Sequence, residues 1–229
     1  MMKSRKLRVV FGGVLVGVVL SLVPLAGIAY ETQLDARAIH EAYVLGQRND
    51  KATGDFLANY LSQISEPQNG PHIAEIALLT PYAQIVDRSR QKTTEGSTEE
   101  QATQDYKSRG NVIRVNIVLM LPTAYPQTAD SATTTAPATR TEKSDLRPEN
   151  FWQKFQFNLK QQGKAIPSKG ISNQPIHSTA TNNAPAVLDG ENVWLEFDVK
   201  DVGSEETTVE VITPEAKVIK ATFDLKKLR

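Results

Sequence analysis

The sequence predicts an α+β protein, in which a helical region at residues 31–109 is followed by an antiparallel, immunoglobulin-like β-sandwich at residues 111–229. Three observations support this division. Apolar residues recur at steps of three and four between Leu34 and Ile64, which is the period of an amphipathic helix. After residue 111 they alternate with polar residues, and β-branched side chains become frequent. Turn residues separate these alternating runs, as in an antiparallel sandwich.

Helix signals are frequent in the first region. Amphipathic helices are expected over 34–45 and 56–64, because each has a single apolar stripe. The Thr-Pro pair at 80–81 indicates another helix start, since proline suits the first helical position. The sequence Ser-Thr-Glu-Glu at 97–100 fits a capping box that opens a polar helix. The short apolar run 73–79 is compatible with either a strand or a helix.

The second region contains the strand signals. Strands are expected at 112–121, 193–200 and 219–225, with a further one around Val209 and Val211. Thr, Ala, Ser and Pro dominate residues 123–143, and such a composition predicts a disordered segment that interrupts the β-domain. The run from Thr208 to Val218 resembles the strand–turn–strand of immunoglobulin-like modules. This resemblance implies an architecture and no partner.

The N-terminus has the residue order of an export segment. Four basic residues among the first eight precede an apolar run over 9–29. Pro24 ends the helical part of this run, and the small residues Gly27 and Ala29 favour a signal peptide, 1–29, that is cleaved before Tyr30. The alternative is a transmembrane helix that anchors the protein to the inner membrane, because 21 residues are enough to span a bilayer. Both alternatives place the rest of the chain outside the cytoplasm, in the periplasm or cell envelope.

Charge and cysteine content exclude several classes of protein. Removing the four N-terminal basic residues from the 26 in the chain leaves 22 against 26 acidic residues, a net charge of −4. A mildly acidic body argues against a nucleic-acid partner. The chain has no cysteine, which excludes disulfides, thiol catalysis and metal sites built on thiolates.

No catalytic, metal-binding or cofactor-binding residues are predicted. The three histidines, His40, His72 and His177, lie in separate segments, so a solvated or core role is favoured over metal binding. Neither a nucleophile elbow, a phosphate-binding loop nor a His-Glu-x-x-His motif occurs in the sequence. We expect no cofactor.

Two tryptophans are the candidate interaction surface. Trp194 is out of phase with Leu195 and Phe197, which belong to the apolar face of the same predicted strand. Trp194 therefore either covers a second layer or contacts a partner. Trp152 lies in an aromatic segment and is the second candidate.

Three runs of the sequence resemble a family of uncharacterised exported proteins of soil bacteria: Ile39–Asn49, Leu78–Gln84 and Val193–Lys200. The resemblance would extend over most of the chain after the export segment. It implies export, and it carries no activity or site residues.

The sequence therefore favours a non-enzymatic binding or structural module of the cell envelope, attached to the membrane through its N-terminal segment and contacting an envelope protein. The alternative is an envelope hydrolase whose site is assembled from dispersed residues. A polar pocket that collects His72, Glu75 or His40 would favour the hydrolase. A flat apolar patch around Trp194 would favour the binding module.

Overall fold

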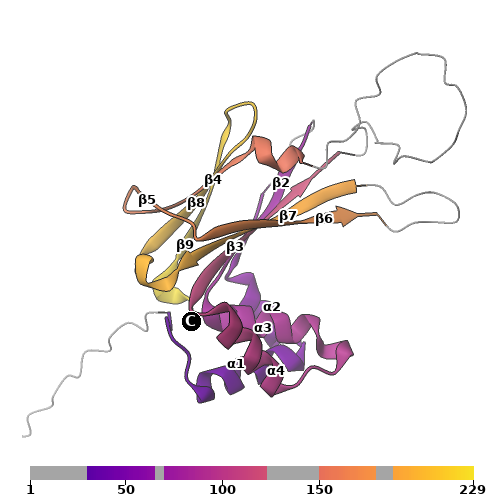
Figure 1. Ribbon diagram of the computed structural model, residues 1–229, viewed down its shortest axis with the longest axis vertical. Helices are drawn as coiled ribbons and strands as arrows, with labels where there is room; N and C mark the ends of the chain where they lie inside the picture. Colours follow the sequence, from indigo (N-terminus) through magenta and orange to yellow (C-terminus); the bar gives the residue numbers. More distant parts are fainter. Residues whose placement is uncertain (1–29, 65–69, 123–149, 179–187) are drawn as a thin grey trace, which may run out of the picture.

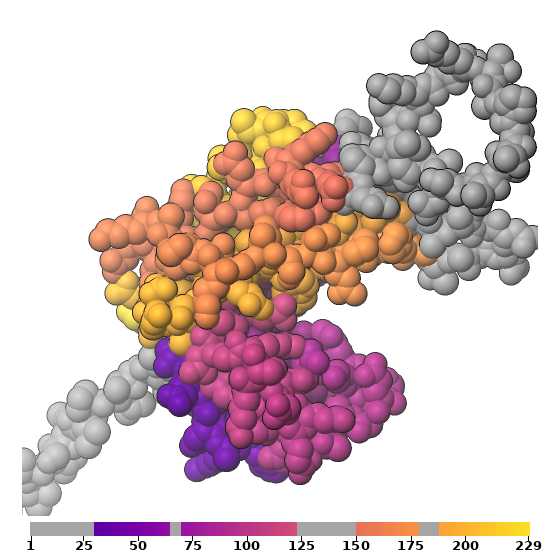
Figure 2. Space-filling view, in the orientation of Figure 1, coloured from indigo at the N-terminus to yellow at the C-terminus, as the bar shows by residue number. Residues whose placement is uncertain are grey.

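The computed structural model describes residues 30–64, 70–122, 150–178 and 188–229. These residues form four α-helices and two antiparallel sheets with nine strands (Figure 1), so the predicted α+β class is confirmed. The predicted export segment, 1–29, and the predicted disordered segment, 123–143, lie outside the described residues. The space-filling view shows the helices as a rounded mass at one end of the strands (Figure 2).

The predicted transmembrane helix, and with it the attachment to a membrane through the N-terminal segment, is corrected. Among the residues with a described structure, no helix is both long enough and apolar enough to cross a bilayer. The longest of them has 13 residues, whereas a membrane span needs about 20. The apolar run 9–29 itself is outside the described part of the chain.

Each of the four α-helices begins at a residue whose side chain accepts a hydrogen bond from a free backbone N–H of the first turn. The capping residues are Asp35, Asp50, Thr80 and Thr98. At Thr98 a reciprocal capping box forms with Gln101. The helices are α1 (Ala36–Arg48), α2 (Lys51–Ala58), α3 (Pro81–Gln91) and α4 (Glu99–Arg109).

The helices have a small core of their own. The apolar stripes of α1, α2 and α3 meet in it, and the half-buried Tyr106 of α4 packs against its edge. Gly46 lies where α1 crosses α3: a Cβ atom there would be 2.4 Å from the carbonyl oxygen of Val86. The absence of a side chain at this position therefore sets how closely the two helices approach. The buried members of this core are Leu34, Ala38, Ile39, Ala42, Leu57, Tyr82, Ile85 and Val86.

Sheet A has the strand order β1-β2-β3-β7-β6. The central strands β3 and β7 pair without interruption from Val112 opposite Asp198 to Met120 opposite Gly190. Because the run 73–79 pairs with β3 as strand β2, the alternative left open by the sequence is decided in favour of a strand. The strands are β1 (Leu61–Gln63), β2 (His72–Leu79), β3 (Val112–Met120), β7 (Leu188–Asp198) and β6 (Gly170–His177).

Sheet B has the strand order β5-β4-β8-β9. Its strands are β4 (Gln156–Gln161), β5 (Lys164–Ile166), β8 (Glu206–Ile212) and β9 (Val218–Asp224). Short 3₁₀ turns connect or end several elements: η1 (Thr93–Glu95), η2 (Phe151–Lys154), η3 (Val199–Asp201) and η4 (Leu225–Lys227).

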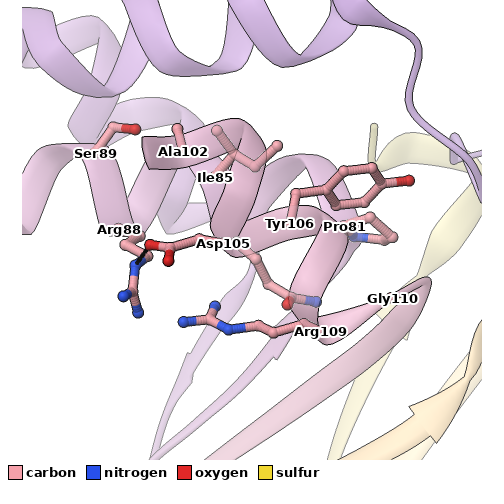
Figure 3. A pocket seen from close by; sticks show the side chains of 10 residues that line it. Pro81, Ile85, Arg88, Ser89, Ala102, Asp105, Tyr106, Arg109 and Gly110 are labelled. Atoms are coloured by element: carbon pink, nitrogen blue, oxygen red, sulfur yellow. Dashed lines mark ion pairs between the residues drawn. The ribbon is translucent and has the colours of Figure 1, made fainter. Parts of the chain in front are cut away.

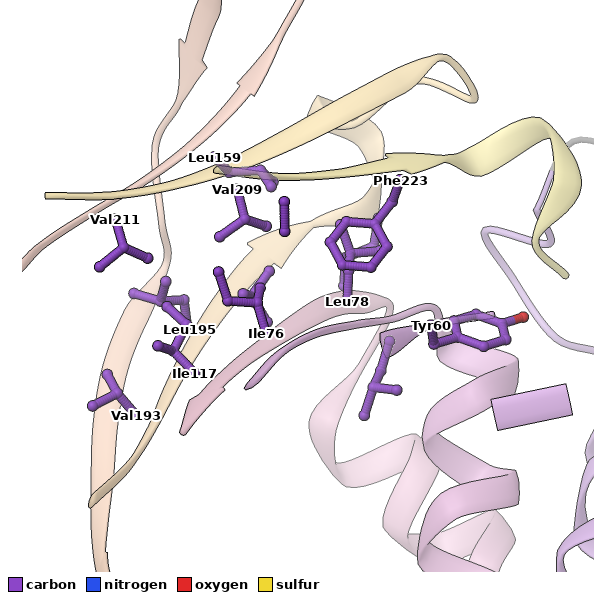
Figure 4. Packing of buried hydrophobic residues seen from close by; sticks show 14 of the residues in the cluster. Tyr60, Ile76, Leu78, Ile117, Leu159, Val193, Leu195, Val209, Val211 and Phe223 are labelled. Carbon is purple, nitrogen blue, oxygen red and sulfur yellow. The ribbon is translucent and has the colours of Figure 1, made fainter. Parts of the chain in front are cut away.

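Buried residues of both sheets belong to one hydrophobic cluster. Side chains on alternate positions of each strand point into it, as the period of two residues requires. Figure 4 shows Ile76, Leu78, Ile117, Val193 and Leu195 of sheet A together with Leu159, Val209, Val211 and Phe223 of sheet B. Sheet A therefore has one face in this core, and its other face is available for a site.

Candidate functional site

The second face of sheet A, together with α2 and α3, forms a groove with a volume of about 380 Å³. We call it the Trp194 groove. Strands β1, β2, β3, β6 and β7 supply its floor, and the two helices supply one wall. The lining residues are Leu57, Leu61, Glu75, Ala77, Leu79, Asp87, Arg90, Gln91, Asn116, Gln174, Asn192 and Trp194.

Strand register brings the central residues of the groove together. Asn116 on β3 lies directly opposite Trp194 on β7, and Ala77 on β2 lies on the other side of Asn116. Side chains of residues opposite each other in adjacent strands are on the same face and about 5 Å apart at Cβ. Asn192 is two residues from Trp194 on β7 and therefore on the same face of the sheet, and it lies opposite Gln174 of β6. The floor of the groove is thus an indole ring surrounded by side-chain amides.

Trp194 is held by a cation. The guanidinium carbon of Arg114 lies 4.3 Å from the centroid of the indole ring, within the range of a cation–π interaction. Arg114 in turn pairs with Glu196, with 3.2 Å between Nε and Oε1. Arg114 is not among the groove-lining residues, whereas Trp194 is. Arg114 therefore restrains the orientation of the ring, and the ring contributes to the lining of the groove.

Asn116 has an unsatisfied acceptor beside this ring. Its Oδ1 atom is buried and has no hydrogen-bond partner among the described residues. A buried carbonyl oxygen without a partner destabilises the folded state by about 1–3 kcal/mol. Such a group indicates a position where a ligand hydroxyl or amine would be stabilised.

Two carboxylates and one guanidinium line the helical side of the groove. Burial, followed by the negative charge of Asp87, raises the pKa of Glu75. Asp87 is itself paired with Arg90, at 3.2 Å between Oδ1 and Nη2. The groove therefore contains the partly desolvated carboxyl group of Glu75 and the ion pair between Asp87 and Arg90, whose charges offset each other.

The structure separates the two tryptophans that the sequence indicated as one interaction surface. Trp152 is in η2, where its half-buried ring packs against the main hydrophobic core. Its indole N–H is buried and has no acceptor among the described residues. Trp152 does not line the Trp194 groove, and a contact of Trp152 with a partner stays a prediction.

The three histidines also lie apart. Nδ1 of His40, on α1, is 2.8 Å from Oε2 of Glu99 on α4, in an exposed position. His72 is buried at the start of β2, and His177 is exposed at the end of β6. In the described part of the chain, no group of three or more His, Cys, Asp or Glu residues could hold a metal ion.

A second hollow lies between α3 and α4 (Figure 3). Arg88 and Asp105 form an ion pair across it. Burial, and then the positive charges of Arg88 and Arg114, lower the pKa of Arg109 at its edge. The hollow has a volume of about 20 Å³, which is room for about one water molecule. It is a packing defect between helices and not a ligand site.

Sequence reasoning identified Trp194 and named Glu75 as a possible pocket residue with the histidines. It did not predict that Glu75 lies beside Trp194, and it missed Asn116, Asp87 and Asn192. A signal for Asn116 was present, because it is a polar residue in an aliphatic strand, on the same face as Arg114. Glu75 and Asp87 gave no comparable signal, since their proximity depends on β2 pairing with β3 and on α3 packing over the sheet.

Comparisons with known proteins do not place the chain in a family. No protein-family model matches it, and no curated protein matches it. The resemblance to a family of exported proteins of soil bacteria stays a prediction.

Proposed function

We propose that this protein is an exported, non-enzymatic binding module of the cell envelope, and that the Trp194 groove is its binding site. The observation that carries the proposal is the pairing of an immobilised indole ring with the unsatisfied Oδ1 of Asn116 on the floor of a groove. Binding sites are typically concave, with a few polar groups that converge on the ligand. The groove has this form. It differs from the flat apolar patch that the sequence associated with a binding module, and it includes Glu75, which the sequence associated with the hydrolase.

A sedimentation experiment tests the proposal. The protein should sediment with isolated envelopes of the cells that produce it, and Trp194→Ala should weaken this association by about tenfold or more, because aromatic anchors dominate binding energy. Trp152→Phe is the matched control, since Trp152 packs on the core away from the groove. Equal sedimentation of the wild type and Trp194→Ala would contradict the proposal.

The location outside the cytoplasm rests on the order of basic, apolar and small residues in 1–29. If the segment is removed on export, the protein recovered from the cell envelope should begin at Tyr30. N-terminal sequencing of the envelope and cytoplasmic fractions measures this. An uncleaved chain found in the cytoplasm alone would oppose export.

For the architecture, we infer that the two sheets form an antiparallel β-sandwich. Support comes from the single hydrophobic cluster to which both sheets contribute. The immunoglobulin-like resemblance concerns the hairpin of β8 and β9, whose residues Ile212 and Val218 face each other at the turn. An experimentally determined structure that placed the sheets in separate cores would oppose this architecture.

The second candidate is the envelope hydrolase, and one observation favours it. Glu75 and Asp87 line the same groove, and the pKa of Glu75 is raised by burial and by Asp87. A carboxyl group with a raised pKa beside a second carboxylate is a feature of general acid catalysis in glycoside hydrolysis. If this candidate is correct, the protein should cleave envelope glycans, and Glu75→Gln should abolish cleavage while binding remains. An intact glycan after prolonged incubation favours the binding module.

A further inference from the structure

We infer that the ligand of the Trp194 groove is an uncharged oligosaccharide, an inference that rests on the proposed binding site and adds the chemical class of its occupant. The groove combines the two features that recognise a sugar: an indole face for the apolar C–H side of the ring, and fixed donors and acceptors for its hydroxyl groups.

The hydrogen-bonding groups of the groove suit hydroxyls. Four side-chain amides line it, those of Gln91, Asn116, Gln174 and Asn192. Each amide can both donate and accept, as each hydroxyl of a sugar does, although the amide of Gln91 already donates one hydrogen bond to Asp87, at 2.7 Å. The buried Oδ1 of Asn116 lacks a donor among the described residues, and a sugar hydroxyl can supply one.

The indole is positioned to stack on the sugar. The indole ring lines the groove, and Arg114, 4.3 Å from its centroid, holds it and polarises its π-electrons. The register with Asn116 places the amide beside this ring. One pyranose ring can thus contact the part of the indole that lines the groove and donate a hydroxyl to Asn116 at the same time.

The charges of the groove favour a neutral ligand. Arg90 is the one cationic residue among those that line it, and Arg90 already pairs with Asp87. Glu75 remains as a carboxyl group without an ion-pair partner among the described salt bridges. An anionic sugar would approach this carboxylate without a compensating cation, and like charges in a partly desolvated site repel each other.

The volume is compatible with a short oligosaccharide. About 380 Å³ lies at the lower end of the range of about 300–1,000 Å³ seen for ligand sites. The lining residues come from all five strands of sheet A, from β1 to β6, so a linear chain that crosses the strands would contact more of the groove than the sugar that stacks on Trp194 does.

Intrinsic fluorescence tests the inference, because the chain has two tryptophans. In Trp152→Phe the emission comes from Trp194 alone. Titration with cellotetraose, maltotetraose and tetra-N-acetylchitotetraose should produce a saturable change in this emission with at least one of the three. Tetragalacturonate, which carries carboxylates, should bind about tenfold or more weakly than the best neutral sugar.

Asn116→Val, made in the Trp152→Phe protein, distinguishes ligand binding from a structural role. Replacing an unsatisfied buried amide in a strand by a β-branched residue should maintain or raise the melting temperature, while affinity for the sugar falls about tenfold or more. Asn158→Val is the matched control, because Asn158 is a half-buried strand residue on sheet B. It should leave the affinity unchanged.

Three results would overturn the inference: no response of Trp194 to any neutral sugar, unchanged affinity in Asn116→Val, or equal affinity for tetragalacturonate. The sedimentation experiment separates this failure from failure of the proposed function. If envelope association still depends on Trp194 but no sugar binds, the site remains and the ligand class is wrong. If association is independent of Trp194, the site itself is wrong.

Discussion

Two aromatic residues of β7, Trp194 and Phe197, lie on opposite faces of sheet A, and their substitutions should have different effects on stability. Phe197 is 2% exposed in the main core, whereas Trp194 is half-buried on the opposite face. We expect Phe197→Ala to lower the free energy of unfolding by about 3–5 kcal/mol through lost burial and a cavity. Trp194→Ala loses its stacking with Arg114, worth about 1 kcal/mol. Chemical denaturation of both variants measures the difference, and a larger loss for Trp194→Ala would show that the groove residue is structural.

The protonation of Glu75 should make the stability of the folded state depend on pH. Burial and the charge of Asp87 raise its pKa above the value in the unfolded chain. The folded state therefore binds the proton more tightly, and stability falls as the pH rises through the folded-state pKa. Glutamine has nearly the same shape as glutamate but does not ionise, so Glu75→Gln should not lose stability in this way. We expect Glu75→Gln to have a higher melting temperature than the wild type at pH 7 and little difference near pH 4. The measurement is thermal unfolding of both proteins at pH 7 and at pH 4. If Glu75→Gln raised the melting temperature less at pH 7 than at pH 4, the raised pKa of Glu75 would be contradicted.

The sequence predicted which residues of β7 face the core, but it did not predict which residues lie beside Trp194. Alternation places Leu195 and Phe197 on one face and Trp194 on the other, and the structure confirms that the first two are buried. The neighbours depend on which residue of β3 lies opposite Trp194. That register is set by long-range pairing, and a slip of one residue would exchange Asn116 for an aliphatic residue.

Among the elements, the contact between α1 and α3 depends on Gly46. A Cβ at this position would lie 2.4 Å from the carbonyl oxygen of Val86 and 2.6 Å from Cβ of Ser89. Gly46→Ala must therefore push the helices apart, and we expect it to destabilise the protein by about 1–3 kcal/mol. Gly54→Ala is the control, because nothing lies within 4 Å of a Cβ there and Gly54 is inside α2. Removing glycine from an open helical position should stabilise by about 0.4–1 kcal/mol. Thermal unfolding of both variants tests the contact, and equal effects would show that α1 and α3 adapt freely.

Element prediction succeeded where local chemistry was decisive. Capping by Thr80 and Thr98 is a local interaction, and both α3 and α4 begin directly after these residues. The strand β2 was ambiguous because a short apolar run has no period that distinguishes strand from helix. Strand β6 was missed since most of its residues are exposed and it contains Pro175. Its pairing with β7, and not its own sequence, makes it a strand.

For the whole molecule, the helical and β parts are connected more closely than the sequence indicated. Strands β1 and β2 fall within the region 31–109, yet they belong to the same sheet as β3 and β7. Near the other end of the described chain, the hydroxyl of Tyr30 donates to the carbonyl oxygens of Val199 and Val202. These contacts join segments more than 160 residues apart, which no local pattern in the sequence could reveal.

Arg229 makes the most extensive connection of this kind. Its guanidinium donates to Glu31 at 3.1 Å and to Glu41 of α1 at 2.7 Å. The same group lies 4.3 Å from the ring centroid of Tyr82 on α3. The backbone N–H of Arg229 is 3.0 Å from the hydroxyl oxygen of Tyr60. Arg229, at the end of the β region, thus contacts four separate parts of the helical region.

We therefore expect Arg229→Ala to lower the free energy of unfolding by about 1–3 kcal/mol, because it removes charge-assisted hydrogen bonds and a stacked cation. Arg37→Ala is the matched control: Arg37 also pairs with Glu41, at 2.8 Å, but its side chain is 86% exposed. Loss of an exposed pair of this kind should leave the melting temperature nearly unchanged.

The difference in stability between the wild type and Arg229→Ala should depend on pH. Hydrogen bonds from Arg37 and Arg229 lower the pKa of Glu41 in the folded state, so their stabilisation is complete above the unfolded-state pKa and is lost as the pH falls through the folded-state value. Denaturation at pH 7 and pH 3 should show the two proteins converging in acid, and a difference that persists unchanged at pH 3 would mean that Arg229 acts through packing on Tyr82 and not through its carboxylate partners.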